Sequence, residues 1–258
     1  MGHPLDGARE RLKRAYENIR ILNAEIETFL APLPIIRFEG KKPVFSDLDQ
    51  RTFNELKDFV NREIDPRWSI LAGEIIHHIR SAFDHLAWKL SSTNQRLNHP
   101  TRIEFPVFLN DPAADKNELH SYGRKVEGIS STTALARIDG LQPYHRRRNP
   151  ASHPLWIIHD LDRIDKHREL ILTFYGLQSE VSGQFLRFTI IDQRAYELRP
   201  RSVRYFGPPL DMKVWGQISA QITIGEPIQG ETQPIIPTLK ELLGFAITQI
   251  ENFAGEFV

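Results

Sequence analysis

Most of the chain shows the pattern of apolar and polar positions that is typical of helices. Apolar side chains recur at steps of three or four, which places them on one face of an α-helix. The predicted long helices span residues 5–30, 68–92, 154–170 and 237–253. Pro32 and Pro34 end the first of them, because proline removes a helical hydrogen bond. Shorter helices are predicted near 112–123 and 131–138.

Alternation with a period of two follows the third long helix and predicts antiparallel strands. These strands cover residues 171–177, 185–192, 203–206 and 212–225. Additional strands are predicted at 35–38, 44–45 and 103–108. Residues 52–64 could form a strand or a helix, and we favour a strand. We therefore expect an α+β fold, in which a bundle core of about four long helices packs with an antiparallel β-sheet or meander.

No linker or internal repeat divides the chain, so we expect residues 1–258 to form one domain. Its helical core would lie mainly in 68–172, followed by a β-rich region at 171–226 and a C-terminal helix at 237–253.

Composition and charge exclude several classes of protein. The sequence has no cysteine, which excludes disulfides, thiolate metal sites and a cysteine nucleophile. Lys plus Arg equals Asp plus Glu at 33 each, so nucleic-acid binding would need a local basic patch. Without a signal peptide or an apolar run long enough for a membrane span, we expect a cytoplasmic protein that binds no membrane.

The polar face of the predicted helix 68–92 is unusual for a solvent-facing surface. Such a surface is normally built from Lys, Glu and Gln, whereas this one is rich in imidazole, guanidinium and carboxylate groups. It carries His77, His78, Arg80, Ser81, Asp84, His85, Trp88 and Lys89. Arg80 and Asp84 are four residues apart, a spacing that allows them to pair along the helix.

The predicted helix 154–170 continues this chemistry. His159, Arg163 and His167 follow one another at steps of four, opposite the apolar face. Asp165 falls within the apolar face, where a carboxylate is costly unless it is paired. We expect Asp165 to meet Arg80 or His85 of the other helix, which would make the two helices neighbours and lower the pKa of Asp165.

These residues resemble a known family. The segments GEIIHHIRSAFDHLAWKL, FPVF (105–108), LQPY (141–144) and PLWIIHDLDRIDKHREL (154–170) are similar to uncharacterised bacterial proteins. The Arg-x4-His string from Arg80 to His85 resembles the signature of HEPN-type helical proteins, many of which are metal-independent endoribonucleases that act as dimers. The resemblance implies that RNA is the substrate, that the protein is a homodimer, and that no metal or other cofactor is needed.

The same resemblance implies a catalytic set of Arg80, His85 and Asp84. Arg80 would stabilise the phosphate and His85 would move protons while the ribose 2′-hydroxyl attacks, leaving a cyclic phosphate. The supporting residues would be His77, Asp165, His167, Arg163 and His159. A basic run at Arg146, Arg147 and Arg148 would bind the RNA backbone, and Trp88 could stack on a base.

Two alternatives stay open. In the first, the His, Arg and Asp side chains form a buried network in a non-catalytic interaction or structural module. In the second, they hold a metal in a phosphohydrolase. The ligands available for that metal are His77, His78, Asp84, His85, His159, Asp160 and His167. The basic run and Trp88 also have plainer interpretations, as a solvated loop and as a packing residue.

Overall fold

The computed structural model describes most of the chain. It covers residues 2–32, 36–40, 62–168, 170, 172–181, 184–187, 214–228 and 231–257. The α-helices in this part of the chain are α1 (Asp6–Leu30), α3 (Arg67–Leu90), α4 (Thr93–Asn98), α5 (Lys116–Val126), α6 (Thr132–Gly140), α7 (Pro154–His167) and α8 (Ile235–Glu251). The four predicted long helices are therefore confirmed, and so are the two shorter ones.

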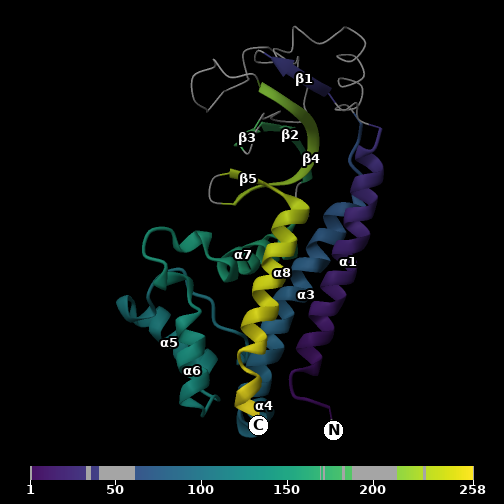
Figure 1. The fold of residues 1–258 in the computed structure, drawn as a ribbon. Coiled ribbons are helices and arrows are strands. Elements are labelled where there is room, and N and C mark those ends of the chain that lie inside the picture. The colour runs from purple at the N-terminus through teal and green to yellow at the C-terminus, as the bar shows by residue number, and fades with distance from the viewer. Residues whose placement is uncertain are drawn as a thin grey trace.

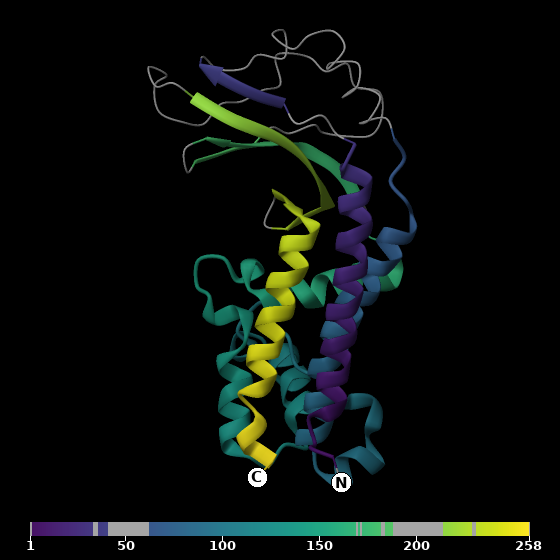
Figure 2. The same ribbon diagram turned by 45° about the vertical axis from the view of Figure 1, so that its right-hand side comes forward.

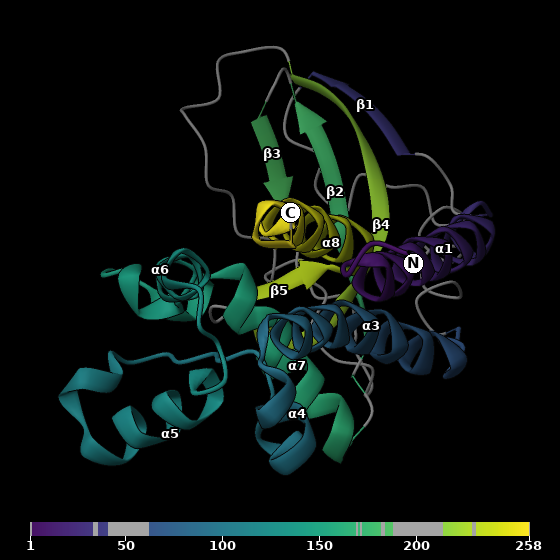
Figure 3. The same cartoon turned by 90° about the horizontal axis from the view of Figure 1, so that it is seen from below.

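Helices α1, α3 and α8 lie side by side along the length of the molecule, and both chain ends are at the end away from the sheet (Figures 1 and 2). Helices α1 and α3 are antiparallel: Gly7 near the start of α1 faces His85 near the end of α3, and Glu25 contacts Trp68 at the opposite ends. Helix α7 packs on α3 and α8, and the view from below shows it beside α3 (Figure 3). The expectation that the two His-rich helices are neighbours is confirmed.

The core fills the space between these helices. Leu12, Ile79 and Leu155 are among its members, and each is almost completely shielded from solvent. Burial of such aliphatic side chains contributes roughly 1.5–3 kcal/mol each. Each long helix therefore uses its apolar face against another helix.

The strands form an antiparallel sheet at one end of the helices (Figure 1). They are β1 (Ile36–Gly40), β2 (Leu172–Val181), β3 (Gln184–Arg187), β4 (Val214–Ile228) and β5 (Glu231–Pro234). The order across the sheet is β1-β4-β2-β3, and β5 pairs with β4.

The expected fold class, an α+β domain in which the bundle packs with an antiparallel sheet or meander, is wrong. The described part of the chain is mostly helical. Its strands are not ordered as a meander either, since β4 lies between β1 and β2. The strand order could not be predicted because alternation along a strand carries no information about the neighbouring strands. The expected packing of helices on the sheet is wrong because the apolar faces of the helices are buried against one another.

Individual strand predictions had different outcomes. Residues 103–108 are not a strand but an irregular segment. Its backbone bonds to side chains: Phe105 N–H donates to Asp84 Oδ1 at 2.9 Å and Phe108 N–H to Gln142 Oε1 at 3.1 Å. The strands predicted at 44–45 and 203–206, and most of those at 52–64 and 185–192, lie outside the described residues.

Candidate functional site

Arg80 on α3 is buried, with 4% of its surface exposed. Its Nη2 donates to the carbonyl oxygen of Phe105 at 2.9 Å and forms an ion pair with Asp84 Oδ1 at 3.0 Å. Its Nη1 is buried and has no hydrogen-bond partner within the described residues. Because Asp84 also accepts from the Phe105 N–H, Arg80 and Asp84 together hold the backbone of the 103–108 segment. Burial raises the pKa of Asp84, and the charge of Arg80 opposes this increase.

His159 on α7 lies in the same electrostatic environment. Its burial, together with the charges of Arg80 and Lys125, lowers the pKa of His159 to about 4. Glu104 forms an ion pair with Lys125. Burial, the largest single effect, raises the pKa of Glu104, but the hydrogen bond and charge of Lys125 together with the charge of Arg80 outweigh it, so the pKa is lowered. His159 is therefore neutral near pH 7, next to charged groups.

His77 contacts a residue that the sequence analysis did not single out. Asp162 on α7 is buried, and its carboxylate lies 3.1 Å from His77 Nδ1 and 2.6 Å from Lys166 Nζ. The spacing of Asp162 and Lys166, four residues apart on a helix, was the signal that could have identified the pair. Asp165 instead lies against Gly73 of α3, where a Cβ would be only 2.0 Å from its Oδ1.

His85 faces α1, away from Arg80. Residues five positions apart point about 140° apart around a helix, so the two ends of the Arg-x4-His string contact different elements. The Nε2 of His85 lies 2.8 Å from Nη2 of Arg11. A guanidinium only donates hydrogen bonds, so His85 accepts at Nε2 and carries its proton at Nδ1, the nitrogen that faces Gly7.

Arg11 is the centre of a group of side chains that we call the Arg11 cluster, formed by Arg11, Arg14, His78 and His85. Arg14 is paired with Glu17 at 3.1 Å, and the charge of Glu74 acts on His78. Burial and the charge of Arg11 lower the pKa of His85, whereas Asp84 acts to raise it. Burial, His77 and Arg11 lower the pKa of His78. Both imidazoles are therefore largely neutral near pH 7.

Two polar atoms of the Arg11 cluster, Nε of Arg11 and Nδ1 of His78, are buried without a hydrogen-bond partner in the described structure. An unpaired buried polar atom costs about 1–3 kcal/mol, so two of them in one cluster are an uncommon feature of a folded protein. Arg11, His78 and His85 are nevertheless only partly buried, and Arg14 is exposed. The sequence analysis missed Arg11, which is next to Leu12 at the polar edge of its helix.

The remaining predicted residues lie on the surface. Arg163 pairs with Asp160 at 2.7 Å, one turn away on α7, and His167 is exposed in the last turn. Arg146 donates from Nη1 to the Ser152 carbonyl oxygen at 2.6 Å. Its neighbours in the basic run are Arg147 and Arg148, and both are exposed.

Metal ligands do not gather in the part of the chain that the structure describes: no group of three or more His, Asp or Glu side chains there could hold an ion. The candidate ligands of the predicted metal site are instead divided among the contacts given above. His77 pairs with Asp162, Asp84 with Arg80, and His85 with Arg11.

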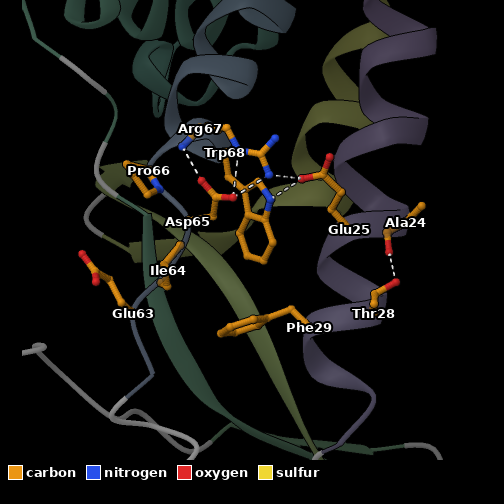
Figure 4. Close-up of a pocket in the computed structure, with 10 residues that line it drawn as sticks. All are labelled: Ala24, Glu25, Thr28, Phe29, Glu63, Ile64, Asp65, Pro66, Arg67 and Trp68. Carbon is orange, nitrogen blue, oxygen red and sulfur yellow. Dashed lines mark hydrogen bonds and ion pairs between the residues drawn. The ribbon is translucent and has the colours of Figure 1, made fainter.

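A hollow of about 600 Å³ lies at the other end of α1, where that helix approaches the start of α3 (Figure 4). The rings of Phe29 and Trp68 meet edge to face there, with centroids 5.3 Å apart. The indole Nε1 of Trp68 donates to Glu25 at 2.7 Å. The hollow is separated from the Arg11 cluster by roughly 20 Å of helix, at 1.5 Å per residue.

The chain matches no protein-family model, no curated protein and no solved structure. Among the residues that the structure describes, no helix is both long and apolar enough to cross a membrane. The geometry of the molecule is therefore the basis of the functional proposal.

Proposed function

We propose that this protein cleaves RNA without a metal ion, at the Arg11 cluster. The single observation that carries the proposal is the 2.8 Å contact between Arg11 Nη2 and His85 Nε2. It joins a permanent cation, which suits a phosphate, to an imidazole, which moves protons near neutral pH. The proposal retains the arginine and histidine chemistry of the HEPN-like resemblance but takes the arginine from α1 instead of Arg80.

The first step is binding of an RNA phosphate by Arg11 and Arg14. The phosphate takes the hydrogen bond that Arg11 otherwise donates to His85, which frees Nε2 of His85. The phosphate also supplies acceptor oxygens for the unpaired Nε of Arg11. The charge-assisted bonds that form are stronger than neutral ones.

In the second step, Nε2 of His85 accepts the proton of the ribose 2′-hydroxyl. The 2′-oxygen attacks phosphorus and the bond to the 5′-oxygen breaks, which gives a 2′,3′-cyclic phosphate. The leaving 5′-oxygen takes a proton from a water molecule, because His78 of the same cluster is itself largely neutral near pH 7.

A second candidate function is a non-catalytic module. The burial of Arg80, with its bonds to Phe105 and Asp84, favours this alternative for that part of the molecule. Arg80 and Asp84 then fix the 103–108 segment on α3 and take no part in chemistry. Dimerisation and a cytoplasmic location stay predictions.

The test is cleavage of labelled single-stranded RNA in excess EDTA by the wild-type protein and by Arg11→Gln and His85→Asn. Loss of a general base typically costs about 10²- to 10⁴-fold in rate, so both variants should be slower by ~100-fold or more. Arg20→Gln on α1 and His120→Asn on α5 are the matched controls, because both side chains are exposed. Equal rates for all five proteins, or dependence on an added metal, would refute the proposal.

A further inference from the structure

Trp88 is an exposed aromatic residue beside the Arg11 cluster. It lies three positions after His85 on α3, and 37% of its surface is exposed. Within the described residues, its indole has neither a hydrogen bond nor a ring contact. Exposure of more than a third of a tryptophan forgoes part of its burial energy, although a polar helix face does not require an aromatic residue there.

The position of Trp88 relative to the cluster suits one nucleotide. Residues three apart on a helix have Cβ atoms about 5–6 Å apart, so Trp88 and His85 leave α3 at adjacent positions on its surface. Lys89 is exposed and next in sequence, and its charge acts on His85. A phosphate held by Arg11 beside His85 would therefore place its attached base within reach of the indole.

We propose that an unpaired nucleobase stacks on Trp88, so that the Arg11 cluster takes single-stranded in preference to duplex RNA. This inference rests on the proposed function. Aromatic side chains stack on bases of any identity, whereas a base inside a duplex is already stacked and paired. The cations of Arg11, Arg14 and Lys89 favour a polyanion over an uncharged protein surface as the occupant.

The experiment measures binding of an oligonucleotide that cannot be cleaved. The probe is a fluorescent 2′-O-methyl RNA of ~10 nucleotides, within the site size of known single-strand binders, offered alone or as a duplex. Fluorescence anisotropy gives the affinity of the wild-type protein, Trp88→Leu and Trp88→Phe. Leucine keeps apolar bulk without a π-face, whereas phenylalanine keeps a smaller one. Circular dichroism checks that the variants fold.

We expect the wild type to bind the single strand more tightly than the duplex. Trp88→Leu should weaken single-strand binding by roughly 5- to 150-fold, the effect of losing one stacked base, and Trp88→Phe by less. Duplex binding should be the same for all three proteins. Equal single-strand affinity in the wild type and Trp88→Leu, or equal affinity for both probes, would overturn the inference.

Parallel cleavage assays on ordinary RNA separate this inference from the proposed function. Cleavage that depends on Arg11 and His85 while Trp88→Leu binds normally overturns the stacking role alone. Binding that depends on Trp88 without any cleavage overturns the nuclease alone and leaves a single-strand binder. If the wild type neither binds nor cleaves, both proposals fail, and a protein partner becomes the remaining occupant of this face.

Discussion

Replacing Gly7 by alanine should disturb the Arg11 cluster while leaving the fold intact. A Cβ at position 7 would lie 2.9 Å from Nδ1 and 3.5 Å from Cε1 of His85. Since comfortable contacts between such atoms begin near ~3.5 Å, the ring must move by about 0.5 Å. The 2.8 Å bond between Arg11 and His85 is on the other side of the ring and changes with it. A misplacement of 1 Å can cost about 100-fold in rate, so we expect a loss of about 10-fold.

The same substitution should have little effect on stability. Alanine gains up to about 1 kcal/mol over glycine inside a helix, and the crowding of His85 offsets part of that gain. Gly244 in α8 is the matched control because no atom lies within 4 Å of its Cβ position. Gly244→Ala should raise the free energy of unfolding by ~0.5–1 kcal/mol and leave cleavage unchanged.

Urea unfolding and RNA cleavage are measured on the same preparations of both variants. We expect Gly7→Ala to stay within about 1 kcal/mol of the wild type and to cleave more slowly. Wild-type cleavage by a normally folded Gly7→Ala would refute the positioning of His85 by α1. A loss of activity that simply follows a loss of folded protein would refute it as well.

Three further predictions concern the contacts that join α3 to its neighbours. Gly73→Ala should destabilise the protein by about 1–3 kcal/mol, the usual cost of overpacking, because the new Cβ would be 2.0 Å from Asp165 Oδ1. A double-mutant cycle with Asp165→Ala tests this cause. If Asp165→Ala does not relieve the loss of stability, the contact is not responsible for it. Arg80→Ala should cost about 2–4 kcal/mol in urea unfolding, since it leaves the Phe105 carbonyl and Asp84 without a cationic partner, and a cost below ~1 kcal/mol would show that the pair is not structural. The pKa of His159 is about 4 in the folded protein and near 6.5 in the unfolded protein. Between pH 4 and pH 6.5, His159 therefore binds a proton in the unfolded state but not in the folded state. Stability should therefore be complete above pH 6.5 and fall by at most about 3 kcal/mol as the pH drops to 4, and His159→Asn should flatten that slope in pH-dependent thermal melts.

The long helices could be predicted because their signal is local. A stripe of apolar residues specifies a helix without reference to the rest of the chain, and α1, α3, α7 and α8 all follow this rule. The order of the strands could not be predicted in the same way, since β4 pairs with the distant β1. Alternation along one strand contains no information about such a partner.

The candidate site shows the same division between local and distant information. The polar face of α3 could be identified from the sequence because its residue types are unusual for a solvated surface. Its partners could not be, because Arg11 is 74 positions from His85 and Asp162 is 85 positions from His77. The rotation of each helix about its own axis depends on the packing of the whole core. This rotation turns His85 toward α1 and Arg80 toward the 103–108 segment, although both residues are on α3.

In the proposed reaction, a 2′-hydroxyl of the RNA itself attacks the neighbouring phosphate at the Arg11 cluster. The most direct measurement is mass spectrometry of the products formed in EDTA from one RNA and from the same sequence with 2′-O-methyl groups. We predict 2′,3′-cyclic phosphate ends from the RNA, their absence with Arg11→Gln, and no cleavage of the methylated strand. Products with 5′-phosphate ends, or cleavage of the methylated strand, would contradict the account.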